Sequence, residues 1–351
     1  MVETISFIKI LTHGAIAFIV GIALTPILTH YLFKYKLWKK TSRNKSVDGG
    51  AMPVFEKFHS DTETKTPRLG GILIWIIPTI MAILFFILSE MDGAIFNKLN
   101  FLSRSQTWLP LFAMVSAAIV GLIDDLLTVR GKGEYSGKGL SLKYRIGSVF
   151  LIGLIGALWF YFKLDWRTLH VPGLGDIVMN FWYIPFFIIA MLAVYSGGVI
   201  DGLDGLAGGS FATIFGAYAV IAGFQGQYDI AALCAAVAGT VLAFLWFNIP
   251  PARFYMGESG TMALCIGITV IAFLTDSVLV LPIIAIVLVV ESGSVILQQL
   301  SKKFRKKKIF IASPIHYHFE AKGWPHYKVT MRFWVIGIIA AVIGVAVRLL
   351  G

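Results

Sequence analysis

Long apolar runs recur along the whole chain, and they constrain its fold more than any other feature. Of the 351 residues, 57% are hydrophobic and 14% are charged, whereas soluble globular domains carry about 25% charged residues. Most runs are roughly 17–25 residues long, the length that a helix needs to cross a bilayer, and a barrel would show short alternating runs instead. The sequence therefore predicts an all-α polytopic membrane protein, with residues 1–351 forming a single integral membrane domain.

Ten of these runs are expected to be transmembrane helices. They cover residues 8–33, 69–88, 108–127, 146–162, 181–200, 206–224, 230–247, 260–275, 278–299 and 333–350. The eighth and ninth runs together would make a helix about twice as long as a bilayer core is thick, so Thr275-Asp276-Ser277 is interpreted as a turn. The first run is too long for a signal peptide, and we expect it to remain as a span. Cys234 and Cys265 lie inside apolar runs and predict neither a disulfide framework nor a metal site.

The basic residues fall mainly on one side of this expected bundle. Of the 30 Lys and Arg residues, 24 lie in loops that follow odd-numbered runs. Because cytoplasmic loops carry the excess of basic residues, loops of about 34–68, 128–145, 248–259 and 300–332 are expected to form a cytoplasmic active-site face, with both termini outside. The net charge of +11 then reflects topology, and attraction to anionic headgroups or a phosphate-bearing substrate is compatible with it. No nucleic-acid partner is expected.

Five carboxylates lie at helix ends on this cytoplasmic side. Asp124 and Asp125 end the third run, Asp201 and Asp204 follow the fifth, and Glu258 follows the seventh. A charge at the mouth of a span is costly unless a cation or polar ligand balances it, and Mg²⁺ prefers oxygen ligands and often bridges to substrate phosphate. The pattern therefore predicts a magnesium site. The acids on the other side form no comparable motif; they are Asp92, Asp165, Asp176, Asp229 and Asp276.

Each motif also has a purely structural interpretation. Asp201 to Asp204 could form a polar turn, Asp124-Asp125 could be interfacial acids, and Gly257-Glu258-Ser259-Gly260 could cap the eighth run. However, adjacent helical residues point about 100° apart, so one aspartate of a pair can bind metal while its neighbour faces a second substrate. Glu291, inside the ninth run, is a functional candidate by default. Its separation from the other motifs in the sequence favours a buried hydrogen bond between helices.

Two histidines in the last long loop, His316 and His318, lie on the same side as the acids. They could be ordinary surface residues, and without cysteines nearby a structural zinc site is not expected. The basic run from Lys302 to Lys308 is best interpreted as a solvated flank of the ninth run.

Five segments together resemble a known family. They are Thr66-Pro67-Arg68-Leu69-Gly70-Gly71, Gly121-Leu122-Ile123-Asp124-Asp125, Asp201-Gly202-Leu203-Asp204-Gly205-Leu206-Ala207, Tyr255-Met256-Gly257-Glu258-Ser259-Gly260 and Pro314-Ile315-His316-Tyr317-His318-Phe319-Glu320. In this order, and over nearly the whole chain, the sequence resembles the phospho-N-acetylmuramoyl-pentapeptide transferases. These form a branch of the polyprenyl-phosphate N-acetylhexosamine-1-phosphate transferase superfamily. The aspartate pairs are common to the superfamily, whereas the histidine segment is specific to the peptidoglycan branch.

The resemblance implies a reaction in peptidoglycan biosynthesis. Phospho-MurNAc-pentapeptide would pass from UDP-MurNAc-pentapeptide to undecaprenyl phosphate, giving lipid I and UMP. The resemblance also implies Mg²⁺ dependence, ten spans, a homodimer, and a place in the bacterial inner membrane with the active site on the cytoplasmic face.

By position, the resemblance also implies roles for single residues. Asp124 would be the base or the partner of the lipid phosphate, with Asp125 beside it. The metal ligands would be Glu258, Asp124 and Asp201, and the catalytic set would be Asp124, Asp125, Asp201, His316 and His318, the histidines at the sugar-phosphate end. Asp201 and Asp204 would contact the nucleotide, Asp204 through uracil, and Tyr255 would stack on uracil. Further substrate-binding candidates are Lys65, Thr66, Lys138 and Gly205.

The sequence departs from the family's pattern at some of these positions. Glu258 stands where the family usually has aspartate, Tyr317 replaces a central histidine, and Thr128 replaces a lysine. Rival interpretations are a sister enzyme that transfers another N-acetylhexosamine phosphate, a transporter, and a catalytically inactive lipid-binding homologue. The histidine segment argues against the first, and acids gathered at one interface argue against the second.

Overall fold

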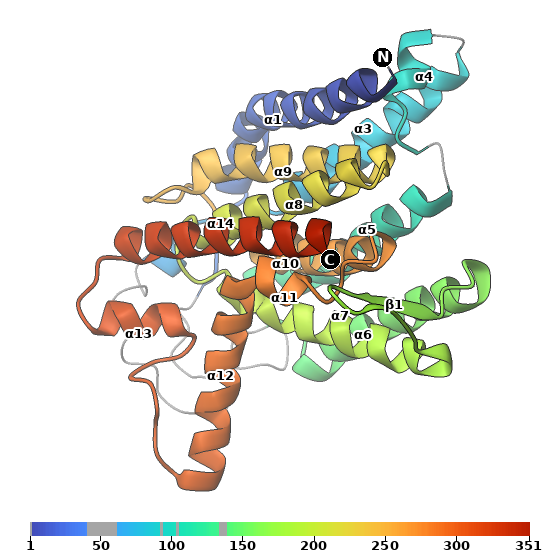
Figure 1. The fold of residues 1–351 in the computed structure, drawn as a ribbon. Helices are drawn as coiled ribbons and strands as arrows, with labels where there is room; N and C mark the ends of the chain where they lie inside the picture. Colours follow the sequence, from blue (N-terminus) through green and yellow to red (C-terminus); the bar gives the residue numbers. More distant parts are fainter. Residues whose placement is uncertain (1, 41–61, 92–93, 103–104, 133–138) are drawn as a thin grey trace.

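The structure, a computed structural model, describes residues 2–40, 62–91, 94–102, 105–132 and 139–351 (Figure 1). Its helices are α1 (Val2–Lys34), α3 (Ile72–Glu90), α4 (Ala94–Leu99), α5 (Ser105–Arg130), α6 (Leu142–Leu158), α7 (Tyr183–Ser196), α8 (Leu206–Phe224), α9 (Tyr228–Asn248), α10 (Gly257–Leu274), α11 (Leu281–Ile284), α12 (Ile286–Arg305), α13 (Ile315–Ala321) and α14 (His326–Leu350). Short helical turns cover Trp159–Lys163 (η1), Asn180–Trp182 (η2) and Gly197–Ile200 (η3). A two-stranded antiparallel hairpin, β1 (Thr168–Val171) and β2 (Gly175–Val178), pairs Thr168 with Val178.

Nine helices in the described part of the chain are long and apolar enough to cross a membrane. Each corresponds to one of the ten predicted runs, which confirms the all-α polytopic fold. Both termini point toward the end of the bundle that carries the hairpin, and α13 lies at the opposite end (Figure 1). We call these the hairpin end and the α13 end.

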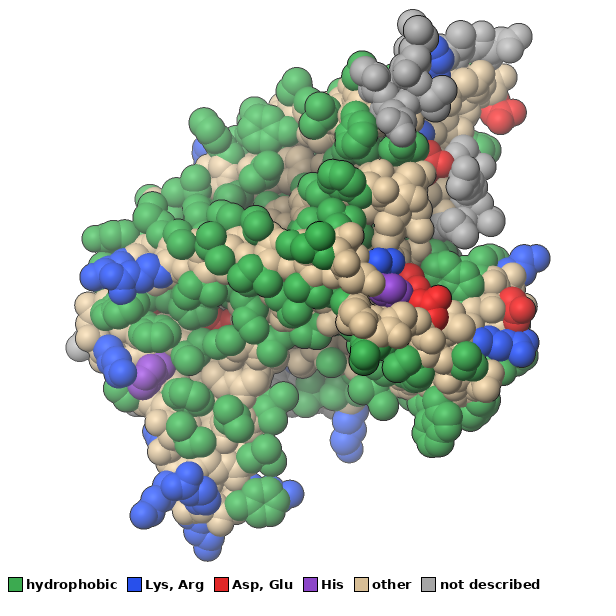
Figure 2. All heavy atoms as spheres, viewed as in Figure 1, with side chains coloured by type: hydrophobic (Ala, Val, Ile, Leu, Met, Phe, Trp, Pro, Cys, Tyr) green, Lys and Arg blue, Asp and Glu red, His purple; other side chains and the backbone are tan. Residues whose placement is uncertain are grey.

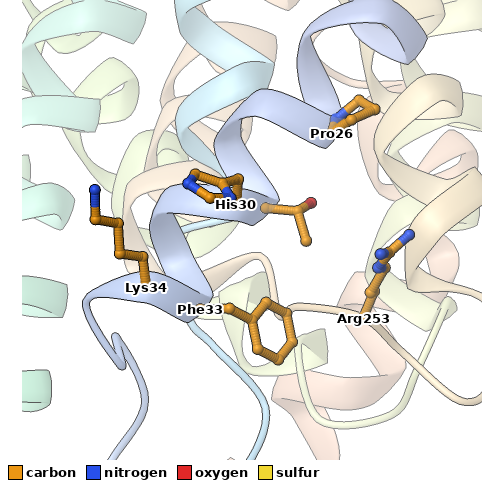
Figure 3. A pocket seen from close by; sticks show the side chains of 6 residues that line it. Pro26, His30, Phe33, Lys34 and Arg253 are labelled. Carbon is orange, nitrogen blue, oxygen red and sulfur yellow. The ribbon is translucent and has the colours of Figure 1, made fainter.

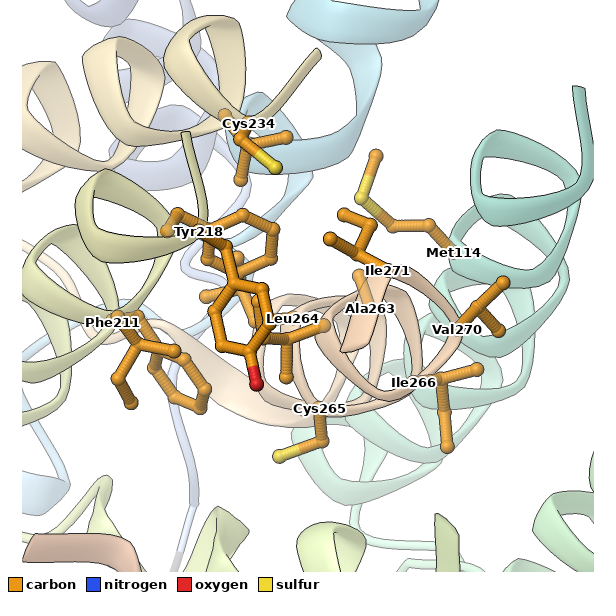
Figure 4. Close-up of a cluster of buried hydrophobic side chains, with 14 of the residues drawn as sticks. Met114, Phe211, Tyr218, Cys234, Ala263, Leu264, Cys265, Ile266, Val270 and Ile271 are labelled. Atoms are coloured by element: carbon orange, nitrogen blue, oxygen red, sulfur yellow. The ribbon is translucent and has the colours of Figure 1, made fainter. Parts of the chain in front are cut away.

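The core of the bundle is built around α10. Every residue of this helix is buried except Glu258, the second residue of its first turn. Helices α5, α7, α8 and α3 pack against it, and Figure 4 shows apolar side chains from neighbouring helices, such as Met114 and Tyr218, gathered around it. A helix that is apolar all round is stable only when it is surrounded in this way. Cys234 and Cys265 are buried within this core.

The outer helices have the opposite character. Helix α14 exposes Val335, Ile336, Ile339 and Val342, and apolar side chains cover the visible face of this helix (Figure 2). Water does not favour such a surface, whereas lipid tails are as apolar as these side chains. The multi-pass membrane protein predicted from composition is therefore also what the surface of the fold requires.

The ninth predicted run, 278–299, does not form one straight span. A turn covers Val278–Val280, α11 lasts only four residues, and Ala285 interrupts the helix with φ −99° and ψ 31°. Helix α12 then leaves the bundle at a steep angle (Figure 1). Its polar face explains this direction, because Gln298 accepts the N–H groups of Ile309 and Phe310 and donates to the Phe310 carbonyl. A lipid-facing span would leave these groups unsatisfied. The predicted turn at Thr275-Asp276-Ser277 is confirmed.

Candidate active site

The first turn of α10 is held by aspartates from two other helices. Asp125, at the end of α5, is completely buried and accepts the backbone N–H groups of Glu258 (3.1 Å) and Ser259 (2.9 Å). Asp201, just after η3, accepts the N–H of Gly257 (3.0 Å). The N-terminus of a helix has unpaired N–H groups and a positive partial charge, so it favours carboxylates. Two of the five predicted carboxylates therefore hold the helix turn that carries a third, Glu258.

Close backbone packing brings these groups together. Gly257 has φ +74°, and a Cβ atom there would lie 2.5 Å from an oxygen of Asp125. A Cβ at Gly121, one turn before Asp125, would lie 2.3 Å from the carbonyl oxygen of Glu258. Glycine is required at both positions, because any side chain would separate α5 from α10. The glycines in the Gly121 to Asp125 and Gly257 to Gly260 motifs are thus part of the site's geometry.

The segment before α3 adds a half-buried arginine. Pro67 accepts the N–H of Tyr255 (2.8 Å), while Gly70 and Gly71 donate to the carbonyls of Tyr255 and Met256 (2.9 Å each). This pairing places the Arg68 Nε atom 3.6 Å from Asp125 Oδ1. Burial alone would lower the pKa of the Arg68 guanidinium, but Asp125 and Asp201 raise it overall.

Three of the carboxylates keep one oxygen for a ligand. Asp124 accepts the N–H of Leu140 through Oδ1 (2.7 Å), Asp201 accepts Gly257 through Oδ2, and Glu258 contacts Arg145 through Oε1 (2.6 Å). Within the described residues, their second oxygens make no hydrogen bond or ion pair. Burial raises the pKa of the Asp201 carboxyl to about 6, against the opposing effect of Arg68.

These oxygens do not form a closed metal cage. The only group of three metal-binding side chains within 4.8 Å of one another in the described residues lies elsewhere. Mg²⁺ is usually held by one or two protein carboxylates and completes its shell with water and substrate phosphates. The free oxygens of Asp124, Asp201 and Glu258 fit that kind of shared site, and they do not fit a metal held by protein alone.

Two arginines complement these acids, and the sequence analysis gave neither a role. Arg145, near the start of α6, pairs with Glu258, and Arg68 pairs with Asp125. The Nε atom of Arg68 is buried without a hydrogen-bond partner in the described part of the chain. A guanidinium carries five N–H donors in a planar fork, so both arginines are suited to donate to phosphate oxygens as well. In the sequence, both arginines are explained as charges that set the membrane topology, although Arg68 lies inside the motif from Thr66 to Gly71.

A second group of residues surrounds Gly205. Asp204 Oδ2 accepts the N–H of Ala252 (2.9 Å), and Gly205, with φ +78°, donates its N–H to Asn248 Oδ1 (2.9 Å). The side chains of Thr62 and Thr66 hydrogen-bond to the Tyr255 hydroxyl, and burial raises the pKa of this phenol. The structure thus brings the predicted substrate-binding residues Asp204, Gly205, Thr66 and Tyr255 to one region. Asn248 was missed, although an asparagine ending an apolar run was a usable signal.

His316 is held beside the Asp201 turn by one buried hydrogen bond and by the contact that the next residue makes with Gly202. Its Nδ1 atom lies 2.8 Å from Glu291 Oε2, and both side chains are fully buried. A Cβ atom at Gly202 would lie 2.4 Å from His316 Nε2, and the Tyr317 hydroxyl donates to the Gly202 carbonyl (3.2 Å). The predicted buried hydrogen bond of Glu291 is therefore confirmed. Glu291 is nevertheless close to the other motifs in space, because the first part of α12 packs against η3, beside Asp201, and the segment after α12 returns His316 to it.

Other predicted residues are not drawn into this group by any recorded contact. His318 accepts the N–H of Ile311 (3.1 Å) and contacts the rings of Phe310 and Phe319, and burial lowers the pKa of its imidazole. Lys65 is exposed. Lys138 lies outside the described residues. The roles of these three residues stay predictions.

Two of the acids that form no motif in the sequence, Asp176 and Asp276, lie in a cluster with His170 at the hairpin end. His170 Nδ1 lies 2.9 Å from Asp176 Oδ1, and Asp276 accepts the backbone N–H of His170 (3.1 Å). Side-chain atoms of all three lie within 4.8 Å of one another. The sequence concealed this cluster because Asp276 is about a hundred residues from the hairpin, and only the fold joins the two.

Comparison with known proteins gives a consistent result. A family model described as glycosyl transferase family 4 matches residues 107–276. The phospho-N-acetylmuramoyl-pentapeptide-transferase of Anoxybacillus flavithermus is 33% identical over 342 residues, which cover 97% of this chain and 98% of that protein. The transferase of the same name from Geobacillus kaustophilus is 34% identical over 338 residues, covering 95% and 96%. That from Lactiplantibacillus plantarum is 36% identical over 291 residues, covering 83% and 86%.

The first two of these relatives are similar to this protein over nearly the whole chain. With a helical membrane fold and acids, arginines and a buried histidine at one end of the bundle, the chain belongs to the phospho-N-acetylmuramoyl-pentapeptide-transferase family.

Proposed function

We propose that this protein transfers phospho-MurNAc-pentapeptide from UDP-MurNAc-pentapeptide to undecaprenyl phosphate, giving lipid I and UMP in peptidoglycan biosynthesis. The observation that supports this most directly is the group of free carboxylate oxygens of Asp124, Asp201 and Glu258 beside the guanidinium groups of Arg68 and Arg145. A diphosphate and a divalent cation need both kinds of group. The names of the relatives supply the identity of the donor sugar.

The reaction exchanges one phosphorus–oxygen bond for another. The bond from the β-phosphorus to the oxygen that bridges it to the α-phosphorus breaks, and UMP leaves with that oxygen and its electron pair. An oxygen of the lipid phosphate forms the new bond to the same phosphorus. Phosphoryl transfer of this kind depends mainly on positioning and on stabilising the charge of the phosphoryl oxygens.

Asp124 is the residue that we assign to the acceptor. Its free oxygen either removes a proton from the lipid phosphate before direct attack or attacks the β-phosphorus itself to give a covalent intermediate. Incubation with labelled UDP-MurNAc-pentapeptide in the absence of lipid separates the two routes. Label that stays on the denatured protein indicates a covalent step, and its absence indicates direct attack.

We assign the divalent cation to the free oxygens of Glu258, Asp124 and Asp201. When bound, Mg²⁺ neutralises charge on the diphosphate and on the departing UMP. Arg68 and Arg145 donate hydrogen bonds to the phosphate oxygens, and His316, held in place by Glu291, lines the sugar-phosphate end. Asp125 positions the first turn of α10 and is a positioning residue in this scheme.

The nucleotide belongs beside Gly205. Asp204 accepts hydrogen bonds from the uracil, Tyr255 stacks on it, and Asn248 keeps the Gly205 turn in shape. The acids of this site and most of the basic residues lie in segments that follow odd-numbered runs. Because cytoplasmic loops carry the excess of basic residues, we place this site on the cytoplasmic face of the bacterial inner membrane, with both termini outside. We also propose a homodimer, which light scattering of the detergent-solubilised protein tests.

The test is a reconstituted assay with purified full-length protein, undecaprenyl phosphate and Mg²⁺, in which UMP release is followed. We expect UMP with UDP-MurNAc-pentapeptide, much less with UDP-GlcNAc, and loss of activity on chelation that added Mg²⁺ restores. Turnover with UDP-GlcNAc alone would assign the protein to a sister reaction. No UMP with either donor, under conditions where a relative is active, would favour an inactive lipid-binding homologue.

A further inference from the structure

A cavity of about 390 Å³ lies between the last turns of α1 and the loop that joins α9 to α10. It is lined by Pro26, Thr29, His30, Phe33, Lys34 and Arg253. Five of these residues lie on α1 at spacings of three and four, so they form one stripe of that helix. Figure 3 shows this stripe on one side and Arg253 on the facing loop.

The two basic side chains of this cavity, Lys34 and Arg253, are exposed, and they also differ in their partners from basic residues that are buried or half-buried elsewhere in the described part of the chain. Lys9, Lys39, Arg68 and Arg145 are each paired with a carboxylate. In contrast, neither Lys34 nor Arg253 lies within 4.0 Å of a carboxylate oxygen of any described residue. The Lys34 ammonium only approaches the ring of Tyr35, at 5.8 Å. Two cations therefore line one cavity, and no carboxylate of the described residues balances them.

The surroundings of the cavity are suited to lipid. Ile27 and Tyr31 on α1 are exposed, and Trp246 and Ile249, near the end of α9, are 66% and 49% exposed. Helices α1 and α9 pack along each other, so these apolar side chains continue along the membrane surface of the bundle away from the cavity. An aromatic residue and basic residues at the end of a span mark the membrane–water interface.

We propose that this cavity binds the phosphate headgroup of an anionic phospholipid, with Lys34 and Arg253 as the groups that contact the phosphate. Basic cavities between transmembrane helices on the cytoplasmic side are suited to anionic headgroups. The guanidinium of Arg253 can donate two parallel hydrogen bonds to the phosphate, and Lys34 adds a point charge. The apolar wall of Pro26 and Phe33, together with the exposed residues of α1 and α9, favours a ligand with acyl chains over free phosphate.

The same loop links this cavity to the candidate active site. Ala252 donates its N–H to Asp204, whereas the next residue, Arg253, points into the cavity. Two residues further on, Tyr255 pairs with Pro67. A bound headgroup would therefore hold a loop that also shapes the Asp204 region, although binding itself does not depend on the proposed reaction.

Native mass spectrometry of the full-length protein tests the proposal. The protein is released from detergent that contains equal amounts of phosphatidylglycerol and phosphatidylcholine, and retained lipid is counted. We expect selective retention of phosphatidylglycerol, and a roughly tenfold to thirtyfold loss of this retention in the Lys34→Gln/Arg253→Gln variant. The matched control, Lys303→Gln/Arg305→Gln, removes the same charge from the exposed end of α12 and should retain phosphatidylglycerol normally.

Other outcomes would overturn the proposal. These are equal retention in the wild type and the first variant, an equal loss in the control, or displacement of phosphatidylglycerol by millimolar inorganic phosphate. Selective loss of undecaprenyl phosphate in place of phosphatidylglycerol would assign the cavity to the acceptor substrate. The conservative Lys34→Arg/Arg253→Lys variant guards against misfolding, because it keeps both charges and should keep the lipid.

Discussion

The two ends of α10 are both capped by side chains from other parts of the chain, but with different chemistry. At its C-terminal end, Gln225 and Gln227 donate to the carbonyls of Thr275 and Leu274 (2.9 and 3.2 Å). At its N-terminal end, Asp125 and Asp201 accept the N–H groups. Neutral amides thus suffice at one end, whereas the other end carries full charges.

This difference separates capping from chemistry. Both carboxylate oxygens of Asp125 accept backbone N–H groups of α10, so capping of the helix is enough to explain this residue. Asp124 makes no recorded contact with the α10 backbone, and the Glu258 side chain points away from it toward Arg145. These two carboxylates are in excess of what the helix needs, and they are therefore the strongest candidates for metal and substrate.

The largest effect is expected from Asp125→Ala. The substitution leaves the N–H groups of Glu258 and Ser259, and the Arg68 guanidinium, buried without partners, which costs about 3–5 kcal/mol of unfolding free energy. Unfolding of the purified protein in detergent, followed by heat or denaturant, measures the loss. Asp176→Ala, at a side chain that is 61% exposed, is the matched control and should cost less than about 1 kcal/mol. Equal losses in both variants would show that Asp125 is not a cap.

The next effect is expected from Asp124→Asn, and it should appear in turnover. The amide can still accept the N–H of Leu140, so the unfolding midpoint should stay near the wild-type value. Loss of the negative oxygen should reduce the rate of UMP release by at least about tenfold, which is about 1.4 kcal/mol. Wild-type turnover in this variant would remove Asp124 from the reaction.

Glu258→Gln should also reduce the rate of UMP release by at least about tenfold, and it should raise the Mg²⁺ concentration that half-maximal activity needs. Because Glu258 also pairs with Arg145, the variants Arg145→Gln and Arg145→Gln/Glu258→Gln are needed beside it. If the ion pair were the only role of Glu258, the three variants would be equally impaired. A Mg²⁺ titration that shifts in Glu258→Gln but not in Arg145→Gln would distinguish metal binding.

The smallest effect is expected at the opposite end of α10. Gln225→Ala removes one neutral hydrogen bond and should cost about 0.5–1.5 kcal/mol of unfolding free energy. UMP release should not change, because this end of the helix lies a full span away from the site. A loss of turnover larger than the loss of stability would contradict the division of α10 into a catalytic and a structural end.

Several parts of the site were predictable because their signal is local. Asp124, Asp201 and Glu258 each follow an apolar run on the same side, and alternation of sides along a membrane chain is enough to group them. Arg68 and Arg145 were not recognised, because they lie among the many basic residues that topology alone explains. The structure shows that both are half-buried and paired with acids.

The break at Ala285 was hidden for a different reason. Residues 278–299 are apolar enough on average to predict a span, and composition does not reveal which side of the helix is polar relative to the rest of the fold. Only the position of 307–316 beside α12 shows what its buried polar residues bind.

The sequence by itself determined the membrane class, the order of the nine long apolar helices that the described residues form, and the gathering of the acids at one end of the bundle, because these follow from hydrophobicity and charge along the chain. It also predicted a tenth span over 278–299, which the structure breaks at Ala285. The tertiary structure alone decided which oxygens remain free, which arginines face them, that Glu291 holds His316, and that Lys34 and Arg253 share a cavity. Those facts depend on contacts between residues far apart in the sequence, and such contacts leave no periodic pattern along the chain.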